Sequence, residues 1–360
     1  MRPAILTVLP DFREEGWHSM DLCADMLVRH APSDTHFEVY QPAFQKRFGW
    51  LPGKRCENFD RWRNRWRVYP RFLKKLPPRD GFYHLVDHSY SHLLHYLPEG
   101  KVGVYCHDLD AFRSILQPDQ EPRPAWYRKM MGRVFEGFKK ARIVFCNTHS
   151  TRNSVLSLGI WNDSEVIHAP LGVAEEFIPT GNHEPGDYLL HVGSCIPRKR
   201  IELLLEVVAA TRTKIPAIRL IQAGGQFTSE QQALQDQLGL ASVVEQRRGL
   251  SRLDLAMLYR GAKMLMVTSD AEGFGLPVIE ALACGTTVLA SDIPSLREAG
   301  GDAARYVSPG IVEEWSICVQ KIWGHAINAP SIEKKAAQAA KYSWGRHCQI
   351  IADGYKTLKR

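Results

Sequence analysis

The sequence predicts an α/β protein with two Rossmann-like, doubly wound domains whose parallel sheets face a central cleft. Short apolar runs of strand length alternate with longer helical patterns along the chain. The strand runs are continuously apolar rather than alternating, as in parallel sheets that are covered on both faces. This pattern stops at a segment rich in Gly and Pro, 178–187, and then begins again. A chain of 360 residues is long enough for two such domains.

Each expected element follows from its local sequence. Strands of the first half are expected at "AILTVL", "HFEVYQP", "GFYHLVD", "KVGVYCHD", "RIVFCNT" and "SEVIHAPLG", with a helix at "SMDLCADMLVRH". In the second half, "YLLHVGS", "IRLIQAGG", "VVEQRR", "MLMVTSD" and "TTVLASD" alternate with helices at "IELLLEVVAATRT", "SEQQALQDQLGL", "LDLAMLYRGA" and "LPVIEALACG". The amphipathic "SWGRHCQIIADGYKTL" predicts a closing helix. The expected domains are 1–178 and 179–342, with 343–360 as a helix that returns to the first domain.

The composition indicates a folded globular protein of the cytoplasm. It is 44% hydrophobic and 24% charged. No apolar run approaches the roughly 20 residues that span a bilayer. The first run, "AILTVL", is followed at once by charged residues in 11–15, unlike a signal peptide. The eight cysteines are scattered without a C-x-x-C pair, so we expect reduced thiols and no disulfide framework.

Positive charge is concentrated in residues 46–75. This segment holds eleven Lys and Arg against Glu57 and Asp60, a local charge of +9 (11 − 2), so the rest of the +7 chain sums to −2 (7 − 9). Its aromatic residues are Trp50, Trp62, Trp66, Tyr69 and Phe72. An ordinary solvated surface, a nucleic-acid patch and an interfacial patch for anionic lipid head groups all remain open. Trp with Arg is typical of membrane interfaces and no nucleic-acid motif accompanies the segment, so we expect peripheral membrane contact and no nucleic acid.

The segment "EGFGLPVIEALACG" (272–285) joins an expected strand to an expected helix and places two carboxylates around a glycine loop. Pro277 suits a first helical position, and Gly285 suits the position just past the end. The loop therefore presents free backbone N–H groups at a helix N-terminus, an arrangement that attracts phosphate. Glu272 lies in the loop and Glu280 lies one turn into the helix, so the two can reach different parts of one ligand.

A helix-dipole role and a dinucleotide site are the alternatives for this segment. An acid in a first helical turn complements the helix dipole by about 0.3–1 kcal/mol, which would account for Glu280 alone. A dinucleotide-binding site is the second alternative, because Gly273-x-Gly275 follows a strand and Asp292 stands 19 residues after Gly273 (292 − 273). Val278 occupies the place of the third glycine, which leaves that fingerprint incomplete.

The sequence of 272–309 resembles the C-terminal signature of retaining glycosyltransferase family 4, the glycosyl transferases group 1, which has the GT-B fold. Glu272 and Glu280 meet its E-x7-E pattern. Similar segments are "VYCHDLDAF", "VIHAPLGVAEEFIP", "HVGSCIPRKRIELLLE", "GLSRLDLAMLYRGA" and the closing "YSWGRHC". The likeness covers most of 80–350 and is specific over 187–310.

This resemblance implies roles in the second domain. Glu272 would contact hydroxyl groups of the donor sugar, and Glu280 would bind the nucleotide ribose. Ser194 stands where the family often has an arginine, so Arg198 and Lys199 together would hold the diphosphate and stabilise its developing charge. A solvated helix start is the alternative for this basic pair. The other expected contacts of the nucleotide sugar are Gly193, Ser194, Gly249, Leu250, Gly273, Phe274, Gly275 and Leu276.

In the first domain, the resemblance implies the acceptor side of the site. His107 and Asp108 match the family's His-Asp, and His107 would hydrogen-bond the transferred sugar or the acceptor. A buried histidine with satisfied hydrogen bonds is the alternative. Gly16 is the one glycine where the family usually has a Gly-Gly loop at the diphosphate.

The histidines of "HLVDHSYSHLLH" have a spacing that would suit a metal site, because His88 and His92 would share one face of an α-helix. No third ligand stands at a fitting interval, so we expect no metal. Asp87 and His88 are instead expected to line the acceptor side.

These residues predict a retaining, metal-independent hexosyltransferase without a cofactor. The donor would be a nucleoside-diphosphate sugar, and the acceptor would be a hydroxyl group of a glycan or lipid-linked glycan that enters past 46–75. Arg198, Lys199 and the helix N-terminus would replace a divalent ion. A nucleotide-sugar epimerase of the same fold and a non-catalytic nucleotide-sugar-binding subunit are the alternatives. We expect a cytoplasmic protein, associated with the cytoplasmic membrane face if 46–75 binds lipid.

Overall fold

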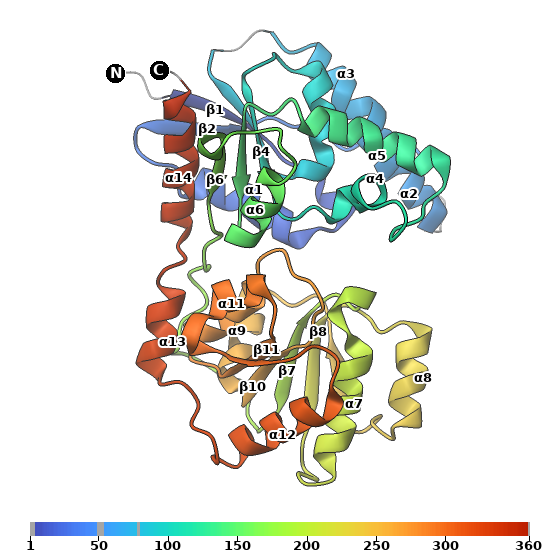
Figure 1. Ribbon diagram of the computed structural model, residues 1–360, viewed down its shortest axis with the longest axis vertical. Helices are drawn as coiled ribbons and strands as arrows, with labels where there is room; N and C mark the ends of the chain where they lie inside the picture. The colour runs from blue at the N-terminus through green and yellow to red at the C-terminus, as the bar shows by residue number, and fades with distance from the viewer. Residues whose placement is uncertain (1–3, 49–53, 78–79, 359–360) are drawn as a thin grey trace. The chain divides into compact units, whose positions relative to one another are not determined.

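The computed structural model of the chain describes residues 4–48, 54–77 and 80–358 (Figure 1). They form two compact units. Unit 1 runs to Leu171 and resumes at Trp344, and unit 2 is Gly172–Ser343. Each unit contains one six-stranded sheet, and every strand pairing in both sheets is parallel. The predicted α/β class with two parallel sheets is therefore confirmed.

The sheet of unit 1 has the order β2-β1-β3-β4-β5-β6. From β1 the chain moves to one side to form β2, then crosses to the other side of β1 to form β3 and the remaining strands. The carboxyl ends of β1 and β3 therefore flank a topological switch point, where sheets of this kind bind ligands. The strands are β1 (Ala4–Leu9), β2 (Thr35–Val39), β3 (Phe82–Leu85), β4 (Val102–Cys106), β5 (Ile143–Cys146) and β6 (Val166–His168).

Helices connect these strands, and the basic segment forms one of the connections. The α-helices are α1 (His18–Arg29), α2 (Lys54–Arg63), α3 (Tyr69–Lys74), α4 (Arg113–Leu116), α5 (Ala125–Phe138), α6 (His149–Leu156) and α14 (Trp344–Thr357). A π-helical turn, η2 (Asn64–Val68), joins α2 to α3. The short 3-10 helices are η1 (Arg13–Glu15), η3 (His88–Tyr96), η4 (Asp110–Phe112) and η5 (Asp163–Glu165).

The closing helix α14 packs on the sheet of unit 1, as Figure 1 shows. The Tyr355 hydroxyl donates to the carbonyl of Tyr83 at 3.0 Å and lies 3.0 Å from Nδ1 of His84. A Cβ at position 103 would overlap that hydroxyl. Gly103 on β4 therefore lets α14 approach the sheet.

Unit 2 repeats this architecture with the order β12-β11-β10-β7-β8-β9. Its switch point lies between β7 and β10, because the chain goes from β7 to β8 on one side and returns to β10 on the other. The strands are β7 (Leu189–Gly193), β8 (Leu220–Gly224), β9 (Val244–Arg247), β10 (Met264–Val267), β11 (Val288–Ser291) and β12 (Arg305–Val307). The helices are α7 (Ile201–Arg212), α8 (Ser229–Gln237), α9 (Arg252–Gly261), α10 (Leu276–Ala283), α11 (Pro294–Gly300), α12 (Val312–Trp323), α13 (Ile332–Ala339), η6 (Pro197–Lys199) and η7 (Gly301–Ala303).

The irregular segment 178–187, which the sequence suggested as a linker, lies inside unit 2. Unit 2 begins at Gly172, before the expected start at 179. The two segments where the chain passes between the units pair with each other inside unit 2. Val173 forms a parallel bridge with Ser343, and the N–H of Val173 donates to the carbonyl of Tyr342 at 3.1 Å. The second crossing between the units lies at 343/344, and the sequence placed its boundary at 342/343.

Two findings bear on the cellular setting. All eight cysteines lie within the described residues, where they are free thiols. Among the described residues, we find no helix with the length and apolar character needed to cross a bilayer.

Candidate active site

The switch point of unit 2 brings the predicted basic pair to the predicted glutamate loop. The loop after β7 contains η6, which carries Arg198 and Lys199. The loop after β10 carries Glu272. Backbone hydrogen bonds join the two loops, since the N–H of Asp270 donates to the carbonyl of Arg198 at 2.9 Å. The Thr268 hydroxyl donates to the carbonyl of Lys199 at 2.9 Å.

Glu272 contacts both cations. Its Oε1 accepts from Nζ of Lys199 at 2.5 Å and from the Ser269 hydroxyl at 2.7 Å. Its Oε2 accepts from Nη1 of Arg198 at 3.2 Å. The side chain of Glu272 is 7% exposed, that of Lys199 is 10% exposed and that of Arg198 is 33% exposed. Lys199 therefore belongs to a buried ion pair, and Arg198 keeps part of its guanidinium at the surface.

The charges at this site favour an anion. Burial would raise the pKa of the Glu272 carboxyl, but the charges of Lys199 and Arg198 outweigh burial and lower the pKa below its ordinary value. Glu272 is therefore ionised at neutral pH. Two cations that share one carboxylate leave a net charge of about +1 beside the carboxyl end of β10. A net positive charge here favours an anionic group.

The start of α10 adds backbone donors to the same loop. Gly275 precedes the helix with a left-handed φ of 102°, and a Cβ at this position would lie 2.9 Å from Cδ2 of Leu296. The helix begins at Leu276, and Pro277, which was expected at the first helical position, is its second residue. The first N–H groups of a helix lack intrahelical partners and attract anions. Phe274 is buried and packs edge-on against Tyr342.

Glu280, the second glutamate of the pattern, is buried in α10. Its Oε2 accepts from the Tyr259 hydroxyl at 2.9 Å. Burial raises the pKa of Glu280 to about 7, although the Tyr259 hydrogen bond opposes the shift. The group therefore titrates near neutral pH. A helix-dipole role alone does not require burial, and the contact with Tyr259 was not visible in the sequence.

In unit 1, the predicted acceptor-side residues follow β3 and β4, which are neighbours in the sheet. Nδ1 of His88 lies 3.1 Å from Oδ1 of Asp87, and Nε2 of His88 lies 3.8 Å from Oδ1 of Asp108. Burial would lower the pKa of His88, but the Asp87 carboxylate raises it above its ordinary value. Nε2 of His107 is 3.0 Å from the carbonyl of Val86, so this histidine is buried and hydrogen-bonded.

The histidine run does not form an α-helical face. His88–Tyr96 is a 3-10 helix with about three residues per turn, so positions four apart do not align. Nε2 of His92 lies 3.0 Å from the carbonyl of Arg65, and Nδ1 of His84 lies 3.0 Å from the Tyr355 hydroxyl. The expected shared face of His88 and His92 is therefore wrong, and the absence of a metal stays a prediction.

Gly16 ends η1 with a left-handed φ of 76° and is exposed. Helix α1 starts two residues later, at His18. The structure thus places Gly16 at a helix N-terminus on the carboxyl side of β1, while its contact with a diphosphate stays a prediction.

Comparison with known proteins agrees with this geometry. Residues 173–316 match the family model "Glycosyl transferases group 1". This part of the chain is therefore a glycosyltransferase domain of that group. The chain is 26% identical over 300 residues to O-antigen chain mannosyltransferase B of Escherichia coli, covering 76% of this chain and 75% of that protein.

Other similar proteins agree with this assignment. The chain is 31% identical over 176 residues to D-inositol 3-phosphate glycosyltransferase of Mycobacterium ulcerans, which covers 46% of this chain and 37% of that protein. The glycosyltransferase also resembles the structure of HepE from Anabaena in complex with UDP and glucose, with a TM-score of 0.68 and 16% identity. That match covers 97% of this chain and 98% of HepE, and it supports the GT-B fold.

The dinucleotide alternative is not supported. Asp292 follows β11, but both its carboxylate oxygens accept from Arg297, with Oδ2 2.6 Å from Nη2. The family match instead covers the whole Glu272–Gly285 segment.

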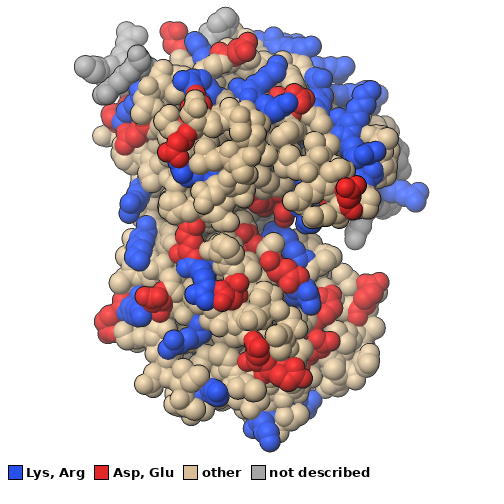
Figure 2. Space-filling view, in the orientation of Figure 1, with Lys and Arg blue, Asp and Glu red and all other residues tan. Residues whose placement is uncertain are grey.

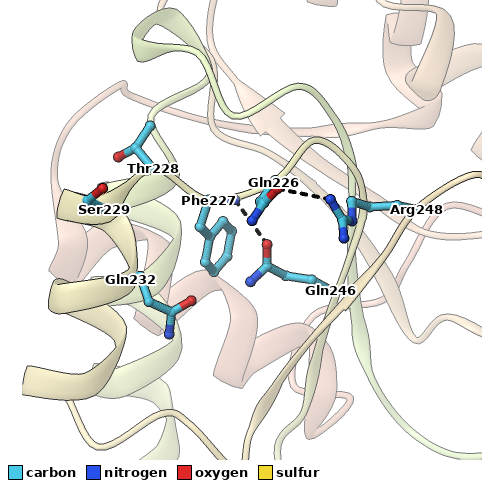
Figure 3. A pocket seen from close by; sticks show the side chains of 7 residues that line it. All are labelled: Gln226, Phe227, Thr228, Ser229, Gln232, Gln246 and Arg248. Atoms are coloured by element: carbon cyan, nitrogen blue, oxygen red, sulfur yellow. Dashed lines mark hydrogen bonds between the residues drawn. The ribbon is translucent and has the colours of Figure 1, made fainter. Parts of the chain in front are cut away.

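The glycosyltransferase has a pocket of about 320 Å³ at the carboxyl ends of β8 and β9 (Figure 3). Arg248, which lines it, directly precedes Gly249, one of the expected contacts of the nucleotide sugar. Nη1 of Arg248 donates to Oε1 of Gln226 at 2.9 Å, and the N–H of Phe227 donates to Oε1 of Gln246 at 3.0 Å. Sequence reasoning missed these side chains, because polar residues in loops resemble ordinary solvated surface.

The basic segment is split between surface and core. Residues 49–53, including Trp50, lie outside the described residues. Trp66 and Phe72 pack against the core and Tyr69 is buried, whereas Trp62 is 41% exposed. Figure 2 shows Lys and Arg gathering over the part of unit 1 that contains α2, α3 and α5. An exposed cationic surface thus exists, but most of its predicted aromatic partners point inward.

Proposed function

We propose that the chain transfers a hexose from a nucleoside-diphosphate sugar to a hydroxyl group of a glycan or lipid-linked glycan, with retention at the anomeric carbon. The contact of Glu272 with Lys199 and Arg198 at the start of α10 carries this proposal. The cations and the helix N-terminus would bind the diphosphate, and Glu272 would accept hydrogen bonds from sugar hydroxyl groups. Glu280 would accept from the ribose.

This division explains why acids and an anion site occur together. The two cations lie on one side of the Glu272 carboxylate and hold it by its two oxygens. Each carboxylate oxygen can accept more than one hydrogen bond, so a sugar hydroxyl can join without breaking the ion pair. As the bond to the sugar breaks, negative charge grows on the leaving diphosphate, and fixed donors stabilise it. These donors would supply the stabilisation that a divalent ion supplies elsewhere, so we propose metal-independent transfer without a cofactor.

Retention in family 4 is usually described as attack on the face from which the diphosphate leaves, with a phosphate oxygen taking the acceptor proton. In this proposal Lys199 and Arg198 hold that phosphate in place. Backbone groups at Gly193, Ser194, Gly273 and Gly275 would contact the diphosphate and sugar. In unit 1, His107, Asp108 and His88 would orient the acceptor hydroxyl.

Similar proteins support the substrate class. Mannosyltransferase B and the inositol 3-phosphate glycosyltransferase transfer sugars, by their names, and HepE binds UDP and glucose. A hexose donor and a polyhydroxylated acceptor are therefore the first substrates to test. The Gln226 and Arg248 side chains at the pocket are proposed to contact the edge of the nucleobase.

The test is a thermal-shift screen of UDP, GDP and ADP, followed by turnover of the matching nucleotide hexoses. A bound diphosphate raises the melting temperature by mass action. Transfer or donor hydrolysis at equal rates with EDTA and with Mg²⁺ would support a metal-independent transferase. Interconversion of nucleotide sugars without an acceptor would indicate an epimerase, and binding without turnover would indicate a non-catalytic subunit. A Mg²⁺ requirement would refute the metal-free mechanism.

We also propose peripheral contact of α2 and α3 with anionic membranes. The surface of α2, η2 and α3 carries three exposed arginines, Arg55, Arg67 and Arg71. Phe59 and Trp62 are exposed beside them. Co-sedimentation with vesicles of phosphatidylglycerol at low salt tests it. Trp62→Ala should weaken binding, whereas Leu253→Ala, at a 63% exposed residue of α9, should not. Equal binding to neutral vesicles would contradict an electrostatic contact.

A further inference from the structure

A second switch point lies in unit 1, between the carboxyl ends of β1 and β3. The two strands pair in register, with Leu9 opposite Leu85, so the residues that follow them emerge side by side. These residues are Asp11 after β1 and Asp87 after β3. Ligands of doubly wound sheets bind at this position. The sequence singled out Asp87 but not Asp11.

Asp11 is buried with its hydrogen-bonding capacity unused. Its exposed fraction is 4%, and neither carboxylate oxygen has a hydrogen-bond partner among the described residues. Another buried acid of unit 1, Asp60, differs sharply, because its Oδ2 accepts from the backbone N–H groups of Arg47 and Phe48 at 3.1 Å each. Asp87 accepts from the N–H of Ser89 at 2.9 Å. Buried polar groups are nearly always paired, so the unpaired Asp11 carboxyl requires a physical reason.

Arg65 brings an unused donor to the same region. It lies on the π-helical turn η2, and its guanidinium carbon sits 4.4 Å from the ring centre of Tyr90 and 5.7 Å from that of Trp17. One terminal nitrogen donates to the carbonyl of Ser89, while Nε is buried without a partner among the described residues. The positive charge of Arg65 is close enough to Asp11 to lower the pKa of its carboxyl, against the larger effect of burial, which raises it.

The chemistry of these groups excludes several ligands. An anion is disfavoured, because burial and the nearby Asp87 carboxylate raise the pKa of Asp11 and so already disfavour negative charge at this position. A metal ion is disfavoured as well, since among the described residues Asp11 does not belong to a set of three close ligand atoms. A neutral diol fits, because its hydroxyl groups can donate to the oxygens of a carboxyl group and accept from a guanidinium N–H.

We infer that Asp11 and Arg65 bind a vicinal diol of the acceptor, which makes the acceptor a polyhydroxylated ring and Asp11 a residue that selects it. This inference rests on the proposed transfer reaction. Trp17, 39% exposed, would provide an aromatic face for the ring carbons beside the diol.

A short, largely exposed loop follows Asp11 in the chain. Within 13–17, Arg13, Glu14, Gly16 and Trp17 are exposed and Glu15 is half-buried. Glu15 accepts from the Tyr90 hydroxyl at 2.9 Å, and Arg13 pairs with Asp25 at the surface. Since Asp11 is buried, a diol can reach it only when neighbouring residues move, and the inference assigns that movement to this adjoining loop. Binding of the diol should therefore change hydrogen exchange in this loop.

The experiment compares Asp11→Asn with Asp60→Asn in the full chain. The acceptor probes are methyl α-D-mannopyranoside and myo-inositol, which distinguish a sugar diol from a cyclitol diol. Asp11→Asn should raise the KM of the preferred probe at least tenfold and leave the donor KM and donor hydrolysis within twofold. It should not lower the melting temperature, because no hydrogen bond to the described residues is lost. Asp60→Asn should lower the melting temperature and leave the acceptor KM unchanged.

Binding of the probes is also measured without a donor, by saturation-transfer NMR. Weaker probe binding to Asp11→Asn than to the wild type supports the inference even if no nucleotide hexose is turned over, in which case the proposed transferase function fails alone. An unchanged acceptor KM and unchanged probe binding in Asp11→Asn would overturn it. A wild-type protein that binds neither probe would also overturn it, and a lowered melting temperature in Asp11→Asn would assign the residue a structural role.

Discussion

Nζ of Lys199 lies 2.5 Å from Oε1 of Glu272, and this buried contact joins the loop after β7 to the loop after β10. The residues are separated by 73 positions in the chain. Arg198 contacts the other oxygen of the same carboxylate. The resulting group is both a structural bond across the switch point and the charged centre of the proposed donor site. Substitutions here should therefore affect stability and catalysis in separable ways.

Replacing Glu272 by Gln should lower transfer at least 100-fold, because the sugar loses a charged hydrogen-bond acceptor. It should also tighten binding of the free nucleoside diphosphate, since Lys199 and Arg198 no longer share their charge with a carboxylate. Calorimetric titration with the diphosphate identified by thermal shift measures this. Without ligand, the buried Lys199 loses its counter-ion at a cost of about 3–5 kcal/mol. Full transfer activity in Glu272→Gln would refute the assignment.

Replacing Arg198 and replacing Lys199 should have different effects on the melting temperature. Arg198→Gln should weaken diphosphate binding roughly tenfold with little loss of melting temperature, because the side chain is one-third exposed. Lys199→Gln should weaken binding and also destabilise the fold, because Glu272 then remains buried with only Arg198 as partner. Equal melting temperatures for the two variants would contradict the buried ion pair.

Glu280 should make stability depend on pH near neutrality. Its pKa is raised from 4.5 to about 7 in the folded chain, so the folded state binds more protons than the unfolded state between these values. The free energy of unfolding should therefore fall as the pH rises through this window. Glu280→Gln removes that loss, and its stability relative to the wild type should grow between pH 5 and 8, by on the order of 1–3 kcal/mol.

Urea unfolding at pH 5, 6, 7 and 8 measures the effect of Glu280→Gln. Glu230→Gln is the control, because the pKa of Glu230 is lowered by its own backbone N–H and by Thr228, so its relative stability should change little across this range. A relative stability of Glu280→Gln that stays constant across this range would show that the wild-type carboxyl titrates normally.

Gly275→Ala should destabilise the chain by about 1–3 kcal/mol, because φ is 102° and the new Cβ would meet Leu296 at 2.9 Å. The displaced start of α10 should also weaken diphosphate binding. Gly132→Ala in α5 is the matched control, since described atoms leave space for its Cβ, and it should gain about 0.5–1 kcal/mol. Thermal unfolding of both variants gives the comparison, and a neutral Gly275→Ala would contradict the close approach to Leu296.

Much of the fold and half of the site follow from local sequence. The strand and helix that flank the 272–275 loop were predicted to within three residues, because apolar periodicity and Pro and Gly at helix ends act locally. Arg198, Lys199 and Glu272 were also predicted by resemblance, and the structure brings them into contact. Their roles in transfer stay predictions.

Other features depend on partners far away in the chain. Trp66 was expected at a membrane surface, yet it stacks on His92 at a ring distance of 4.2 Å. The run His88–Tyr96 has the spacing of an α-helix but forms a 3-10 helix beside α5. Its turn type is set by packing, because local propensities differ by too little to decide it.

The sequence by itself determined two doubly wound units and a glycine loop at a helix start flanked by acids, because these depend on near neighbours. Only the tertiary structure decided which side chains satisfy one another. It paired Lys199 with Glu272 and Tyr259 with Glu280, and it left Asp11 buried without a partner among the described residues. Burial and charge act through space rather than along the chain, so the state of a carboxyl is known only once its surroundings are assembled.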